Sequence, residues 1–119
     1  MAISITPLTN QFIDVLAVDT VASSGGFLDI KAGPATLYGI EVANSHGAAV
    51  YVKLYDARAA TGATVPHMIL MLVNGTTRTF MTTDGIPFTT AISVRCVTES
   101  GTGGTTTPSG GVAIRLWLG

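Results

Sequence analysis

The sequence predicts an all-β protein: an antiparallel two-sheet β-sandwich of about eight strands, jelly-roll-like, forming a single domain over residues 1–119. Three observations lead to this prediction. Apolar and polar residues alternate in four separate segments, and a period of two is typical of strands with one buried face. Turn-forming stretches (SSGG, KAGPAT, NSHGAA, NGTT, TDGIPF) interrupt the chain about every ten residues. No long segment carries a helical apolar stripe, and the many Thr and Val residues disfavour helix. An up-and-down barrel is the alternative architecture.

Four of the expected strands alternate clearly, in residues 36–44, 49–57, 91–99 and 111–119. Their apolar sides carry Tyr38, Ile40 and Val42; Val50, Val52 and Leu54; Ile92, Val94 and Cys96; and Val112, Ile114, Leu116 and Leu118. Because successive side chains of a strand point to opposite faces, each of these sets should face the core.

The other four strands have weaker patterns. Residues 11–22 are apolar on both parities, and residues 27–31 form only a short segment. Residues 67–73 lack alternation but are flanked by turn residues, whereas residues 76–83 alternate around Phe80. The dipeptide Asn74-Gly75 predicts a two-residue hairpin between these last two segments. Asp84-Gly85 predicts a wider corner, because a proline follows two residues later.

The composition restricts the partners of the chain. Its formal net charge is −1 and only 11% of its residues are charged, against about 25% in an average soluble domain. Nucleic acid is not an expected partner, because binding it requires clustered Lys and Arg. A membrane is not expected either, because the longest apolar run, MILMLV at 68–73, is far shorter than the ~20 residues of a spanning helix. A surface so poor in charge suggests burial in a homo-oligomer.

The residues of catalysis and metal binding are scattered along the chain. His46 lies in a turn, His67 follows a proline, and Cys96 is on the apolar side of its strand. No spacing typical of a metal site occurs, and we expect no catalytic residue, cofactor or metal. The sequence does not exclude carboxylates that converge in space as in a hydrolase.

The glycine-rich segment TESGTGGTTTPSGG (98–111) lacks the lysine and the following helix of a phosphate-binding loop. It is therefore expected to be an exposed loop between the last two strands, either making contacts or forming a disordered tip. A candidate interface is expected elsewhere, from outward aromatic and Arg side chains and from an apolar N-terminal arm (about residues 1–22) that reaches a neighbour. Its residues are Phe12, Ile13, Val15, Leu16, Tyr51, Tyr55, Arg95, Arg115 and Trp117.

From Leu37 onward the chain resembles small virion proteins of tailed bacteriophages. The features that carry the resemblance are LYGIEV (37–42), VKLYDA (52–57), TVP (64–66), GIPF (85–88) and the Gly/Thr loop before a final strand. The resemblance implies a capsid cement or decoration protein at the capsid surface of the virion. Such a protein is a β-sandwich, often a trimer, that binds the major capsid protein and acts by binding alone. The alternative is a carbohydrate-binding sandwich of a phage tail or fibre, in which Trp117, Tyr51 and Tyr55 would stack on sugar rings.

Overall fold

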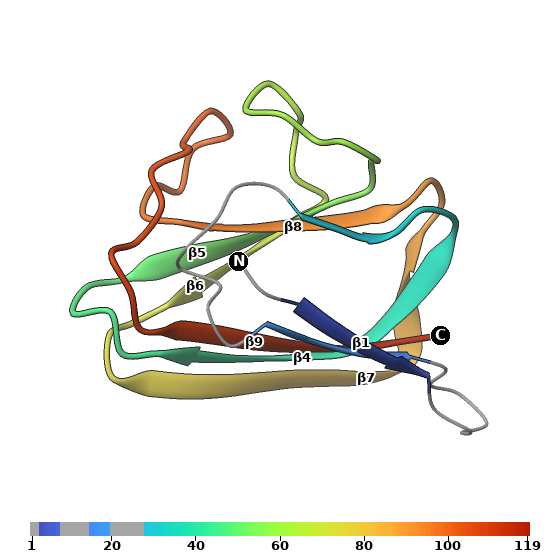
Figure 1. The fold of residues 1–119 in the computed structure, drawn as a ribbon, viewed down its shortest axis with the longest axis horizontal. Helices are drawn as coiled ribbons and strands as arrows, with labels where there is room; N and C mark the ends of the chain where they lie inside the picture. Colours follow the sequence, from blue (N-terminus) through green and yellow to red (C-terminus); the bar gives the residue numbers. More distant parts are fainter. Residues whose placement is uncertain (1–2, 8–14, 20–27) are drawn as a thin grey trace.

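The computed structural model describes residues 3–7, 15–19 and 28–119, and this part of the chain contains nine strands and no helix. The strands are β1 (Ile3–Pro7), β2 (Val15–Asp19), β3 (Leu28–Lys31), β4 (Ala35–Asn44), β5 (Val50–Tyr55), β6 (Met68–Leu72), β7 (Thr76–Phe88), β8 (Ile92–Val97) and β9 (Val112–Leu118). They form two stacked antiparallel sheets (Figure 1). The predicted all-β sandwich is confirmed.

The strand order is that of a jelly roll. The five-stranded sheet has the order β1-β2-β9-β4-β7, and the four-stranded sheet has the order β3-β8-β5-β6. Counted from the middle of the sequence toward its two ends, β5 pairs with β6, β4 with β7, β3 with β8 and β2 with β9. The chain is thus one long antiparallel ribbon whose successive strand pairs alternate between the two sheets. This order excludes the up-and-down barrel, in which consecutive strands are neighbours.

The core lies between the facing sides of the two sheets, where the alternation predicted it. Val50, Val52 and Leu54 are fully buried and face β9 and β4 residues of the same kind, such as Leu116 and Ile40. Cys96 is buried among them and forms no disulfide. Removing this apolar surface from water is the main stabilising contribution, at about 25 cal/mol per Å².

A bulge in β4 changes the predicted position of Tyr38. The pairing of β4 with both neighbours shifts between Leu37 and Gly39, so that Leu37 and Ile40 both face the core. An extra residue of this kind reverses the parity of what precedes it, and the prediction that Tyr38 shares a face with Ile40 is wrong. At Asp84-Gly85, β7 continues as a strand, with Gly85 at a φ of 77°, so the corner predicted here is a bend within β7 and not a turn between two strands (Figure 1).

Asn74-Gly75 forms a tight turn, with Gly75 at a φ of 76°, but not a hairpin. The turn leads from β6 in the four-stranded sheet to β7 in the five-stranded sheet. The Gly75 amide donates to the carbonyl of Asn44 over 2.8 Å, which fixes the turn to the end of β4. The predicted turn is therefore present, but the prediction that the two strands on either side of it pair with each other is wrong.

The expected N-terminal arm lies partly outside the described residues. Within residues 1–22, β1 and β2 are described, and they extend the five-stranded sheet of their own chain by pairing with each other and with β9.

Candidate interaction surface

Loops of the same chain cover the outer face of the four-stranded sheet over β5 and β8, whereas the outward Ile69 and Met71 on β6 are 41% and 53% exposed. Residues 56–67 and 98–111 form the two loops at the top of Figure 1, beside β5 and β8. Lys53, Tyr55 and Val97 point to this outer side, yet none of them is exposed. The two loops also approach each other, because a Cβ built on Gly62 would lie 3.2 Å from the methyl carbon of Thr105.

Residues 98–111 act as a strap across β5 and β8. Beneath the strap, the Lys53 ammonium donates to the carbonyls of Gly101 and Gly104. Arg95 donates to the Thr105 carbonyl over 2.5 Å. The strap is closed on itself by the Glu99 carboxylate, which accepts from the Thr106 amide over 3.0 Å. This segment is therefore a structural cover tied to the sheet, and not the free tip that its glycines permit.

Two pKa shifts accompany the strap. Burial lowers the pKa of the Lys53 ammonium, and the Glu99 carboxylate partly offsets this shift. Hydrogen bonds from Thr106 lower the pKa of Glu99 itself. The shift at Glu99 favours its carboxylate form, whereas burial of Lys53 disfavours the ammonium form.

The loop 56–67 begins with a capping carboxylate. Asp56 accepts hydrogen bonds from the amides of Thr89 and Thr90, over 3.0 and 2.8 Å, and from the Thr89 hydroxyl over 3.0 Å. The bonds from Thr90 and Thr89 lower the pKa of Asp56 to about 2. Ser93 on β8 adds a bond from its hydroxyl to the Ala57 carbonyl. These contacts give Asp56 a structural role in holding the β7–β8 connection.

The five-stranded sheet presents its outer face without such a cover from the described loops. We call this surface the open face. Its outward side chains, all partly or fully exposed, are Leu16, Val18, Glu41, Ala43, Thr77, Thr79, Met81, Ala113, Arg115 and Trp117. Most are small or apolar, which makes the face flat and weakly hydrated.

An apolar row crosses the open face at right angles to the strands. Leu16, Trp117, Gly39 and Met81 are successive partners on β2, β9, β4 and β7. A Cβ on Gly39 would lie 2.2 Å from the Met81 sulfur and 3.1 Å from Cε3 of Trp117. The glycine thus leaves the space in which the thioether approaches the indole ring, a favourable pairing of sulfur and aromatic. Met81 nevertheless stays 55% exposed.

Among the described outward side chains given above for the open face, two are charged, one of each sign. Glu41 and Arg115 are direct partners on β4 and β9. The Thr79 hydroxyl donates to the Glu41 carboxylate over 3.3 Å. These outward side chains together carry no net charge, and they form an apolar row beside a polar one.

The predicted interface residues separate onto two opposite faces of the sandwich. Leu16, Arg115 and Trp117 lie together on the open face. Tyr51, Tyr55 and Arg95 lie on the outer side of the four-stranded sheet, under or beside the loops, and Tyr55 is fully buried. Val15 is in β2, but its side chain is not among those described. Phe12 and Ile13 lie outside the described residues.

The aromatic platform expected for sugar stacking is not formed, since Trp117 and Tyr51 are on opposite sides and Tyr55 is covered. Sequence reasoning missed Gly39 and Met81. The alternation of residues 76–83 around Phe80 does place Met81 on the outer side, but nothing local shows that it meets Trp117.

A groove opens at one side of the sandwich, between the edge strands β6 and β7. It has a volume of about 260 Å³ and is lined by Ile40, Val42, Leu70, Met71, Leu72, Arg78, Thr79 and Phe80. Phe80 and Met71 are 43% and 53% exposed. The two sheets do not close over their core here, so apolar surface stays in contact with water.

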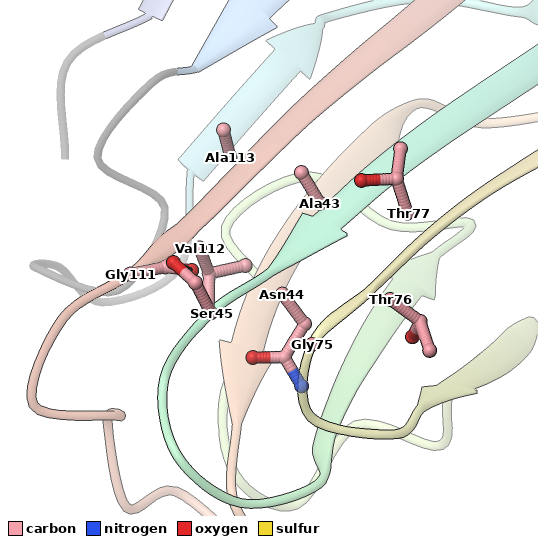
Figure 2. A pocket seen from close by; sticks show the side chains of 9 residues that line it. All are labelled: Ala43, Asn44, Ser45, Gly75, Thr76, Thr77, Gly111, Val112 and Ala113. Carbon is pink, nitrogen blue, oxygen red and sulfur yellow. Dashed lines mark hydrogen bonds between the residues drawn. The ribbon is translucent and has the colours of Figure 1, made fainter.

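A second cavity of about 360 Å³ lies where β4, β7 and β9 meet their loops (Figure 2). Asn44 is buried beside it, but its amide donates to the carbonyls of Ala48 and Leu72 and accepts from the His46 amide. The other lining side chains shown in Figure 2 are short. The Asn44 amide at this cavity therefore holds the neighbouring chain segments in place, and we assign the cavity no binding role.

The described residues bring no three His, Cys, Asp or Glu side chains together as a metal site would require. In the same part of the chain there is no helix long and apolar enough to cross a membrane. Comparison with protein-family models, with curated proteins and with solved structures found no match.

Proposed function

We propose that this chain is a virion structural protein of a tailed bacteriophage: a capsid decoration protein that binds the major capsid protein through its open face and acts as a homo-oligomer, with a trimer as the expected form. The observation that carries the proposal is the difference between the two outer faces. The chain covers one face over β5 and β8 with its own loops, burying Lys53 and Tyr55 beneath them, and leaves the other bare of described loops.

The composition of the open face supports a binding role. Trp, Met and Arg are enriched in interface cores, and a few such residues usually contribute most of the affinity. Trp117 lies in the middle of the apolar row, between Leu16 and Met81. A neutral, weakly hydrated face has little polar surface to desolvate on binding. The resemblance of residues 37–119 to phage virion proteins favours a capsid as the partner.

Assembly of copies strengthens such a contact. A single interface of the size of one sheet face gives modest affinity, but linked copies engage neighbouring capsid subunits at a high effective concentration. A rigid sandwich suits this use, because it loses little conformational entropy on binding.

The test is co-sedimentation of the protein with empty phage capsid shells. Trp117→Ser should weaken shell binding at least tenfold, since loss of a central aromatic residue costs about 2 kcal/mol or more. Tyr51→Ser, on the opposite face, is the matched control and should bind as the unaltered protein does. If Trp117→Ser is folded and decorates shells normally, the open face is not the capsid contact.

A further inference from the structure

The five-stranded sheet has two free edges on opposite sides of the molecule. β1 forms one edge and β7 the other. Within the described residues, β1 pairs only with β2 and β7 only with β4. Each edge therefore carries a row of backbone N–H and C=O groups available to another strand, a situation that proteins usually block or use.

Both edges also carry an exposed apolar side chain on the core side of the sheet. On β1 this is Ile5, the partner of the fully buried Ala17, and it is 47% exposed. On β7 it is Phe80, the partner of the buried Ile40, and it is 43% exposed. The groove between β6 and β7 lies beside Phe80.

A strand added to β7 would place every second side chain on this core side, at the groove. β1 fits the requirement, because Ile5 faces the core side while its neighbour Ser4 faces outward. We propose that copies of this chain associate head to tail, with β1 of one copy added to β7 of the next and Ile5 entering the β6–β7 groove. The inference deepens the homo-oligomer of the proposed function and rests on that part of it.

The direction of the strands defines the contact further. Four antiparallel steps separate β1 from β7, so the two edge strands run in the same direction. If the sheet of one copy continues into the sheet of the next with the same face outward, β7 of the first copy and β1 of the second pair in parallel. Because the contact joins two different surfaces, repeating it produces a ring if the rotation closes and an open filament if it does not, rather than a two-fold dimer.

The size of the contact favours a ring as well. β1 has five residues, and an interface built on one short strand falls below the ~1,200 Å² typical of stable pairs. In a ring each copy makes two such contacts, and the last contact forms within one assembly. A closed ring is therefore more stable than an open pair held by a single contact. A ring would also leave the open face of every copy accessible.

Disulfide trapping tests the arrangement. Ile5→Cys and Phe80→Cys are prepared separately and oxidised mildly, alone and as an equimolar mixture; Cys96 is fully buried and does not interfere. The mixture should give a covalent dimer of one copy of each variant, and neither variant alone should cross-link. The double variant should give covalent rings, whose mass counts the copies. Val65→Cys, 74% exposed in the loop 56–67, is the control and should not cross-link with either.

Each other outcome overturns the inference. Cross-linking of Phe80→Cys alone would indicate a two-fold β7–β7 contact, and cross-linking of Ile5→Cys alone a β1–β1 contact. Light scattering that finds the unaltered protein monomeric at high concentration, with no trapped dimer in the mixture, would show that these edges do not associate. Trp117→Ser in the shell assay concerns a different surface, so failure of the edge contact is distinguishable from failure of capsid binding.

Discussion

Lys53 is predicted to hold the strap 98–111 in place, and replacing it with methionine tests this role. The variant keeps an unbranched stem in the same buried position but removes the donors to Gly101 and Gly104. A hydrogen bond from a charged group contributes about 1.5–3 kcal/mol net. The second bond is long, at 3.3 Å, and the loss of a buried charge partly compensates. We expect Lys53→Met to lower the free energy of unfolding by about 1–2 kcal/mol.

Urea denaturation and limited proteolysis measure the two consequences. The unfolding midpoint should fall, and cleavage should appear within 98–111 under conditions where the unaltered protein is intact, because the strap opens locally. Lys53→Ala should lose about 2 kcal/mol more, since it also removes buried methylene groups. Lys31→Met, on β3, makes the same chemical change elsewhere and should leave the strap resistant. A Lys53→Met variant that is as stable as the unaltered protein and equally resistant to cleavage would refute the role of the ammonium group.

Three further outcomes are expected. Asp56→Asn should lower the urea midpoint of unfolding at pH 7. The pKa of Asp56 is about 2 in the folded state and near 3.8 in the unfolded state, so its carboxylate stabilises the fold fully above about pH 4. The free energy of unfolding should therefore decrease less between pH 4 and pH 2 in the variant than in the unaltered protein. Gly39→Ala should displace Met81 from Trp117, changing the Trp fluorescence at a cost of only about 1 kcal/mol, because the methionine is flexible and exposed. Leu116→Ala, fully buried in β9, should lower the free energy of unfolding by about 2–5 kcal/mol in urea melts.

The fold class and the core could be predicted because they depend on local alternation. Val50, Val52 and Leu54 face the core as their spacing requires. The same spacing placed Lys53 and Tyr55 on the outer side correctly but could not show that two loops cover them. That cover depends on contacts such as Lys53 to Gly101, 48 residues apart, which no periodicity encodes.

The candidate surface was only partly predictable for similar reasons. Trp117 and Arg115 were expected to face outward, and they do. The bulge beside Gly39 was not foreseeable from parity, although it moves Tyr38 away from the face shared by Ile40. The turn at Asn74-Gly75 could be located from its residue types, but turn chemistry does not specify which sheet the next strand joins. The groove between β6 and β7 follows from that choice of sheet.

The position of β9 has a consequence for how the chain folds during its synthesis. β9 is the last strand in sequence, yet it lies between β2 and β4 in the middle of its sheet. Without residues 112–118, β1 can pair with β2 and β4 with β7, but nothing joins these two pairs into one sheet. The five-stranded sheet therefore cannot be completed before β9 has emerged, which makes its folding slow and dependent on contacts distant in sequence. Loss of β9 alone would leave two separated parts of the sheet, β1-β2 and β4-β7, with strand edges exposed to aggregation.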